Sequence, residues 1–136
     1  MTLDEFLAEN LGKKIDFDNY AGAQCVDLAR KYWQDVYGIP EHTGPCATTG
    51  GAKDLYKDYE KMPLEKKYLK KVKTPIQGDT VVWDRIGDSS KYGHVAIVVS
   101  VFKKWLLVAE QDGFKQDGVK FAYRTRDYVL GYLRKR

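Results

Sequence analysis

The run HVAIVVSVFKKWLLVAEQ, residues 94–111, decides the fold class of this chain. It contains two stretches rich in β-branched, apolar and aromatic residues, 94–102 and 105–111, and such stretches are typical of strands. Lys103 and Lys104 separate them, which predicts a tight hairpin. Similar stretches at 80–84, 119–124 and 128–135 predict further strands of the same sheet.

The region upstream of these strands is helical in character. Apolar residues at helical spacing predict helices over 3–11, 25–37 and 51–61, and the turn-rich segments 14–24 and 40–51 predict loops. Gly38 supplies a left-handed cap for the second helix. Helices followed by consecutive strands predict an α+β fold with an antiparallel sheet. We expect a single domain over residues 1–136.

Composition excludes several classes of protein. The 136 residues are 43% hydrophobic, as in a folded protein, and no apolar run approaches the roughly 20 residues that span a bilayer. The net charge of +4 is too small to argue for nucleic acid. The densest basic stretch, residues 66–73, predicts an exposed helix or loop face. The N-terminus lacks a standard signal peptide, so we expect a protein that is cytosolic at birth or a fragment of a longer one.

Cys25 and His94 are the candidate reactive residues. The two cysteines, Cys25 and Cys46, do not form a disulfide framework or a zinc-binding pattern with the histidines. Cys25 stands where a polar loop meets a helix, and a helix N-terminus stabilises a thiolate. His94 opens the most apolar strand, and Glu110 would lie beside it if the two strands pair as a hairpin. A carboxylate there fixes the imidazole tautomer.

Each of these residues also has a structural interpretation. Cys25 could be a buried core cysteine, His94 a half-buried strand residue, and Glu110 a solvated strand end. The combination of all three in this order favours a cysteine nucleophile with a histidine base.

Four segments together resemble one family, the cysteine- and histidine-dependent amidohydrolases/peptidases (CHAP). They are QCVDLAR (24–30), PIQGDTVVW (75–83), GHVAIVV (93–99) and AEQD (109–112). The resemblance covers roughly residues 14–135 and implies a papain-like fold. It also implies Cys25 as the nucleophile, His94 as the base and Glu110 as the residue that orients the imidazole. Asp112 stands where the family often has Asn, and Gln24, with the Cys25 backbone N–H, is a candidate oxyanion donor.

The loop before Cys25 carries a candidate calcium site. Oxygen donors alternate along DFDNYAGAQCVD, and hard oxygen ligands suit calcium. Some phage CHAP domains that resemble this chain bind calcium at the corresponding loop. That resemblance implies the following ligands: the carboxylates of Asp16, Asp18 and Asp27 with the carbonyls of Tyr20 and Gly22. The alternative is that these acids only cap turns and the helix start.

The resemblance extends to phage endolysins that attack staphylococcal-type cell walls. It implies a peptidoglycan hydrolase, either an N-acetylmuramoyl-L-alanine amidase or an endopeptidase of the stem or cross-bridge. We expect a monomer that acts on the extracellular wall without inserting into a membrane. Before acting, it would be held in the host cytoplasm or in the virion. The alternatives are an amidase of small amides, an inactive wall-binding or virion structural domain, and a nucleic-acid binder.

Other residues have weaker claims to a role. We expect His42 to be a surface group and Cys46 to be a bystander. Four aromatic residues could line a groove for a sugar or peptide: Trp83, Tyr92, Trp105 and Tyr123. For Trp105 we expect core packing instead.

Overall fold

The computed structural model describes residues 1–19, 22, 24–40, 50–86, 91–112 and 114–136. Tyr20, His42 and Cys46, which the sequence analysis singled out, lie outside these residues. Within the described chain the helical elements come first: α1 (Leu3–Asn10), α2 (Cys25–Tyr37), α3 (Asp54–Lys57), the 3-10 turn η1 (Tyr59–Lys61) and α4 (Pro63–Tyr68). Among these residues, no helix has the length and apolar character needed to cross a bilayer.

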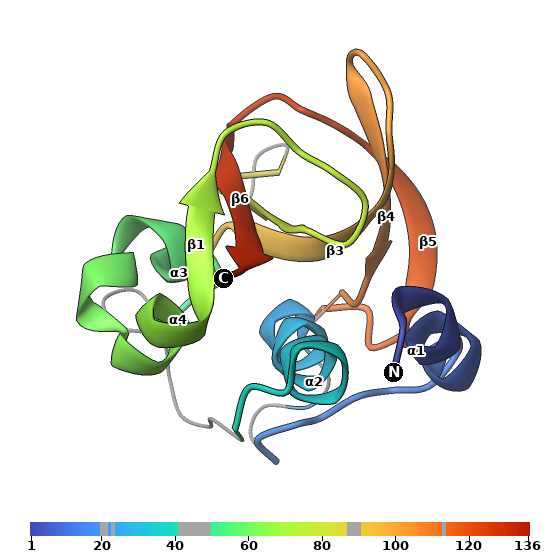
Figure 1. Ribbon diagram of the computed structural model, residues 1–136. Helices are drawn as coiled ribbons and strands as arrows, with labels where there is room; N and C mark the ends of the chain where they lie inside the picture. The colour runs from blue at the N-terminus through green and yellow to red at the C-terminus, as the bar shows by residue number, and fades with distance from the viewer. Residues whose placement is uncertain (20–21, 23, 41–49, 87–90, 113) are drawn as a thin grey trace.

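One antiparallel sheet follows the helices. Its strands are β1 (Leu69–Val72), β2 (Thr80–Trp83), β3 (His94–Val101), β4 (Trp105–Glu110), β5 (Lys120–Thr125) and β6 (Val129–Lys135). They are hydrogen-bonded in the order β1-β6-β2-β3-β4-β5, and every neighbouring pair is antiparallel. The sheet is curled, with α1 and α2 on its outer side (Figure 1). The predicted α+β class with an antiparallel sheet is therefore confirmed.

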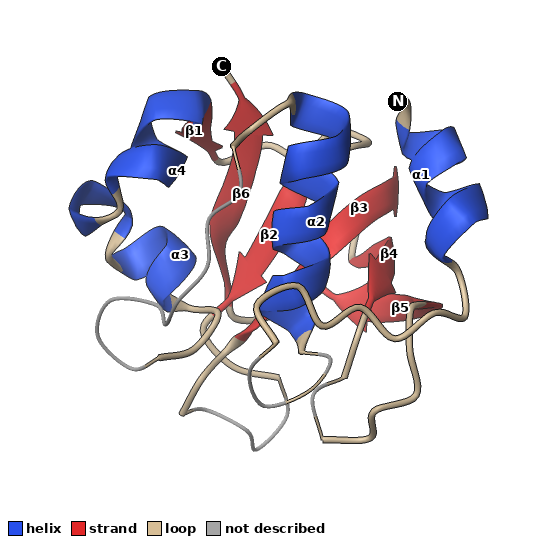
Figure 2. Ribbon diagram, turned by 90° about the horizontal axis from the view of Figure 1, so that it is seen from below, coloured by secondary structure: helices blue, strands red, loops and turns tan. Residues whose placement is uncertain are grey.

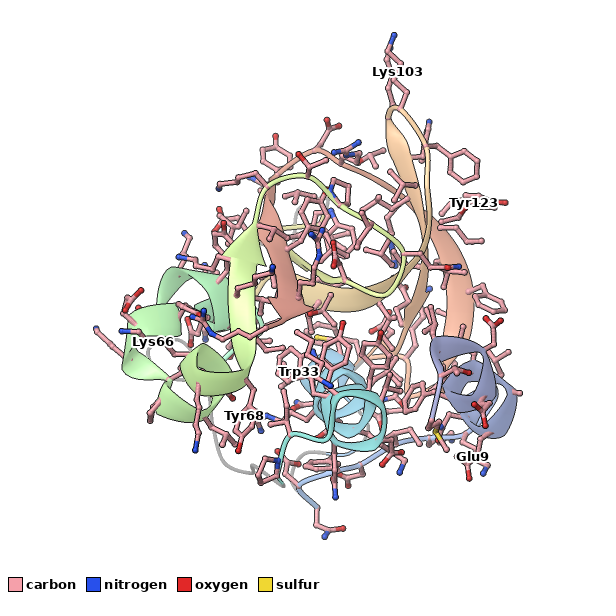
Figure 3. All side chains as sticks on the ribbon, in the orientation of Figure 1. Glu9, Trp33, Lys66, Tyr68, Lys103 and Tyr123 are labelled. Carbon is pink, nitrogen blue, oxygen red and sulfur yellow. The ribbon has the colours of Figure 1, made fainter. Side chains whose placement is uncertain are left out.

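The sheet separates two apolar clusters, because successive side chains of a strand point to opposite faces. On β3, Val95 and Ile97 pack towards α2 in a cluster that includes Leu28 and Trp33. Ala96 and Val98 belong to the second cluster, on the other face, with Trp83, Leu106 and Tyr132 among its members. The labelled Trp33 side chain lies beside α2 below the sheet (Figure 3).

The helix that carries Cys25 forms as the sequence predicts, over residues 25–37. Its start is capped by Asp27, whose Oδ2 accepts a hydrogen bond from the Gln24 backbone N–H at 2.9 Å. Its end is capped by Gly38 in the left-handed conformation, with φ of 73°. Figure 2 shows α2 crossing β2 and β3.

The predicted hairpin of residues 94–111 is also present. Val98 pairs with Val108, and the Phe102 N–H donates to the Trp105 carbonyl at 2.9 Å across the turn. Lys103 projects into solvent from the tip of the hairpin (Figure 3). The antiparallel pairing brings the first residue of β3 and the last residue of β4 to the same end of the sheet.

The segment 51–73 differs from the sequence prediction. The single helix expected over 51–61 is two short turns, α3 and η1, because Asp58 between them leaves helical geometry (φ −108°, ψ 24°). The lysine-rich stretch lies partly in α4, as expected for an exposed helix, and partly in the edge strand β1, which was not predicted. Lysines are common on edge strands because they discourage pairing with other chains. Lys71 of β1 also lies over the Tyr56 ring, 4.3 Å from its centroid.

Candidate active site

Cys25, His94 and Glu110 lie together at one end of the sheet. Cys25 is the first residue of α2, His94 the first of β3 and Glu110 the last of β4. The side chain of Cys25 interacts with the His94 ring and raises the pKa of the imidazole. On the other side of the ring, His94 Nε2 lies 3.1 Å from Glu110 Oε1. Because Nε2 faces the Glu110 carboxylate, Nδ1 is the ring nitrogen that can exchange a proton with the Cys25 thiol.

Glu110 is fully buried and is held by a second partner that the sequence analysis missed. Arg124 of β5 donates from Nε to Glu110 Oε1 at 3.0 Å and from Nη2 to Oε2 at 2.6 Å. This two-point contact fixes the plane of the carboxylate. The signal in the sequence was a lone arginine in the strand pattern VKFAYR. Its partner could not be predicted, because in the β4–β5 register Arg124 lies opposite Leu106 and reaches Glu110 along the strand.

The charges of the three groups depend on one another. Burial alone raises the pKa of Glu110, but hydrogen bonds from His94 and Arg124 outweigh it and lower that pKa from 4.5 to about 2. Burial alone lowers the pKa of His94, but its hydrogen bonds with Cys25 and Glu110 outweigh it and raise that pKa from 6.5 to about 9. At neutral pH the imidazole is therefore protonated and faces Cys25 as a cation.

Two features of neighbouring residues fix the His94 ring in place. The Trp83 ring lies against it, with ring centroids 5.4 Å apart, since Trp83 and His94 pair across β2 and β3. Gly93 has φ of +70°, and a Cβ there would collide with the Trp83 carbonyl oxygen. A residue with a side chain at position 93 could not enter β3 along this path.

Gln111 joins the loop before α2 to the end of β4. Its buried side-chain amide donates from Nε2 to the carbonyls of Ile15 and Gln24, both at 2.9 Å. Its Oε1 accepts from the Ile15 backbone N–H at 2.6 Å. No sequence pattern predicts these contacts of Gln111, although the residue stands within the AEQD motif. These bonds set the position of the helix start that carries Cys25 relative to the strand that carries Glu110.

Asp112 and Gln24 are placed differently from the other three candidates. The Asp112 carboxylate accepts from the backbone N–H groups of Phe114 and Lys115, at 2.8 and 3.3 Å, so it caps the turn after β4. The orienting contact of His94 Nε2 is with Glu110, whereas the Asp112 side chain bonds to this turn. The backbone of Gln24 is held by Asp27 and Gln111, next to the Cys25 N–H. Its role as an oxyanion donor stays a prediction.

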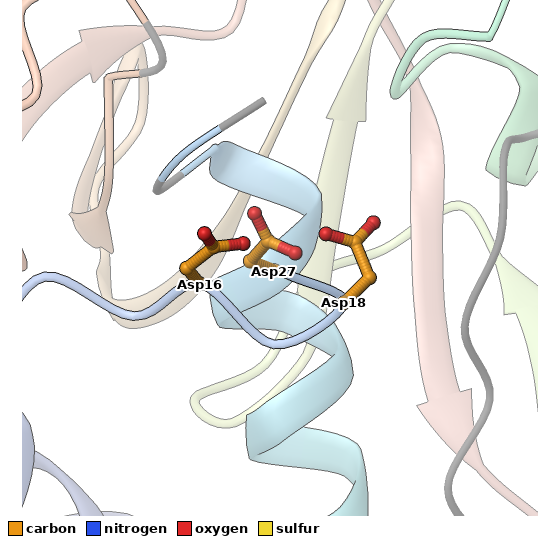
Figure 4. A group of neighbouring side chains, drawn as sticks. All are labelled: Asp16, Asp18 and Asp27. Atoms are coloured by element: carbon orange, nitrogen blue, oxygen red, sulfur yellow. The ribbon is translucent and has the colours of Figure 1, made fainter. Parts of the chain in front are cut away.

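The three predicted calcium carboxylates converge beside the start of α2 (Figure 4). One oxygen from each of Asp16, Asp18 and Asp27 lies within 4.8 Å of the others. Burial raises the pKa of Asp27 to about 6, the hydrogen bond from Gln24 opposes that rise, and the nearby charge of Asp18 adds to it. Arg30 Nη1 lies 3.8 Å from Asp18 Oδ2, so a positively charged side chain stands beside this group of carboxylates. This set of hard oxygen donors fits a calcium ion.

The remaining ligand predictions are not tested by this geometry. Gly22 has φ of +73°, a conformation that glycine adopts freely, and whether its carbonyl binds an ion stays a prediction. Tyr20 lies outside the described residues.

A cysteine at a helix start, facing a histidine oriented by a carboxylate, is the arrangement that cysteine hydrolases use. The CHAP domain family matches residues 15–112, and the chain belongs to this family. This confirms the resemblance expected from the sequence.

Individual proteins resemble the chain as well. It is 30% identical over 108 residues to Endolysin PlyTW of Staphylococcus phage Twort, a match that covers 71% of this chain and 20% of that protein. The chain therefore spans about a fifth of the length of this relative. Solved structures of similar fold include the endolysin LysIME-EF1 (TM-score 0.65, 19% identity, 98% of this chain and 64% of that one). Another is Ly7917 with the hydrolyzing product of MDP (TM-score 0.66, 21% identity, 98% and 63%).

The protonation of His94 can be measured directly. The raised pKa favours the protonated ring, so we expect the imidazole to keep its proton through neutral pH and to lose it as the pH rises through about 9. In Cys25→Ala the midpoint should fall, because the interactions with Cys25 that raise the pKa of His94 are removed. Imidazole chemical shifts in NMR follow both titrations, and a His42→Gln variant assigns the two histidines. An equal midpoint in both proteins would contradict the contact.

Proposed function

We propose that this chain hydrolyses an amide bond of peptidoglycan, with Cys25 as the nucleophile. The observation that carries the proposal is the arrangement of Cys25 at the start of α2 beside a His94 that Glu110 orients through Nε2. Membership of the CHAP family and the likeness to phage endolysins support a cell-wall substrate. Within this class the bond is either that of an N-acetylmuramoyl-L-alanine amidase or that of an endopeptidase.

The reaction follows from the charges of the site. The Cys25 thiolate attacks the carbonyl carbon of the amide, and the negative charge moves to the carbonyl oxygen. The Cys25 backbone N–H and Gln24 are the proposed donors to that oxygen. His94 gives its proton to the leaving amine as the C–N bond breaks, which leaves a thioester on Cys25. His94 then accepts a proton from water, whose oxygen attacks the thioester and restores the thiolate.

Substitution of Cys25 tests the proposal. Cys25→Ala should abolish the release of soluble fragments from purified staphylococcal peptidoglycan, because the proposed thioester forms on the Cys25 sulfur. Cys46→Ala is the matched control and should release fragments as the parent does. Mass spectrometry of the fragments identifies their new termini and so the bond that is cut.

Equal release by the parent and Cys25→Ala would contradict a cysteine mechanism. No release by either folded protein, with calcium present and with walls of several Gram-positive hosts, would favour an inactive wall-binding or structural domain.

We also propose that Asp16, Asp18 and Asp27 bind a calcium ion, with the carbonyls of Tyr20 and Gly22 as further ligands. The convergence of three carboxylates supports this, since their mutual repulsion is relieved by a divalent cation. Asp27 stands two residues after Cys25 on α2, so an ion here would hold the loop against the helix start that presents the nucleophile. The ion would supply this positional restraint, while the proton transfers stay with His94.

Thermal unfolding tests calcium binding. After treatment with chelator and removal of the chelator, added calcium should raise the unfolding temperature. The stabilisation is about 2.7 kcal/mol when free calcium is about a hundred times Kd. Asp16→Asn should weaken this response, because Asp16 is an exposed ligand whose loss disturbs the fold little. Asp35→Asn, which removes the same charge from the opposite end of α2, is the control. The site is contradicted if both variants respond like the parent, or if the parent does not respond.

A further inference from the structure

A pocket opens beside Trp83, a member of the apolar cluster on the sheet face opposite α2. Its volume is about 360 Å³, and it lies between the end of β2 and the connection from β5 to β6. The residues that matter for its chemistry are aromatic or charged: Trp83, Arg85, Trp105, Arg124, Asp127 and Tyr128. Trp105, for which the sequence predicted core packing, is 48% exposed, so that prediction was wrong. The pocket therefore presents aromatic surface and hydrogen-bonding groups together, which is the usual lining of a ligand site.

Tyr128 is held in this pocket at a conformational cost. Its φ is +64°, a left-handed value that is unfavourable for a bulky side chain, yet the side chain is 60% exposed. Glycine or asparagine would adopt this backbone more easily. The Tyr128 carbonyl accepts from the Asp84 N–H at 2.9 Å, and Arg85 lies over the ring, 5.1 Å from its centroid. Backbone strain of this kind is common at ligand-binding positions, so it indicates a function for the exposed Tyr128 ring.

The charges of the lining favour an uncharged ligand. Arg124 is neutralised by its two hydrogen bonds to Glu110. Arg85 and Asp127 carry opposite charges, so the pocket has no excess of positive charge for a polyphosphate. Aromatic faces beside paired donors and acceptors suit a sugar ring, which offers C–H groups on its faces and hydroxyl and amide groups at its edges.

The pocket adjoins the candidate active site through two shared residues. Trp83 lines the pocket and also packs against His94, and Arg124 lines it while holding Glu110. We propose that this pocket binds one sugar unit of an N-acetylated glycan chain and so acts as a glycan subsite beside the hydrolytic site. The choice of glycan rests on the proposed peptidoglycan substrate.

Binding can be measured without cleavage in the Cys25→Ala protein, with tetra-N-acetylchitotetraose as the probe. The three tryptophans provide an internal control in NMR spectra of the indole N–H groups. The signals of Trp83 and Trp105 should shift on titration, because both residues line the pocket. The signal of Trp33 should stay in place, since Trp33 lies in the other apolar cluster.

A substitution at Tyr128 separates binding from folding. Tyr128→Asn, made in the Cys25→Ala protein, should weaken binding about five- to tenfold through loss of the aromatic contact. Its unfolding temperature should be unchanged or higher, because asparagine tolerates the left-handed backbone. Phe114→Ala removes an aromatic ring that is 84% exposed and outside the pocket lining, and it should bind the probe like the unsubstituted Cys25→Ala protein.

Three results would overturn the subsite: no indole shifts up to the solubility limit of the probe, equal binding by the Tyr128→Asn protein, or shifts with inorganic polyphosphate in place of the saccharide. Failure of the proposed hydrolysis is a separate outcome. In that case the saccharide binds as described, but the parent protein releases no fragments from peptidoglycan.

Discussion

The buried carboxylate of Glu110 is the constraint on which the rest of the site depends. A carboxylate removed from water is costly unless charged or hydrogen-bonding partners surround it. The fold supplies His94 from β3 and Arg124 from β5, the two strands that flank β4. Glu110 therefore orients the imidazole and, together with Cys25, raises its pKa, while His94 and Arg124 keep the carboxylate ionised. The pairing of β3 with β4 thus brings Glu110 to His94, and this contact influences both the orientation and the charge of the imidazole that faces Cys25.

The end of β4 also positions the nucleophile. Successive residues at a strand end point to opposite sides, so Glu110 reaches His94 while Gln111 reaches the loop before α2. Gln111 binds Ile15 and Gln24, and Gln24 is in turn held by Asp27 of the first helical turn. Two adjacent residues thereby connect the histidine strand and the cysteine helix. The three aspartates of the proposed calcium site lie in this same region.

The sequence predicts the elements that carry strong local patterns. The helix 25–37, the hairpin 94–111 and the meeting of Cys25, His94 and Glu110 follow from periodicity, caps and antiparallel pairing. Arg124 and Gln111 could not be found this way, because their partners are set by strands and loops far apart in sequence. Strand β1 was not predicted because two consecutive lysines follow Leu69, so the strand shows no alternation of apolar and polar residues. The exposure of Trp105, the first residue of β4 after the hairpin turn, depends on what the folded chain packs against it, which no local pattern reports.

The rate of peptidoglycan hydrolysis by Glu110→Gln tests the central claim most directly. Glutamine keeps the shape of the side chain but removes the charge that, with Cys25, raises the pKa of His94 and that orients its ring. With a folded variant, confirmed by its unfolding temperature, the account predicts a rate about a hundredfold or more below that of the parent. A rate within about twofold of the parent would contradict it, because the buried charge would then contribute little to the reaction.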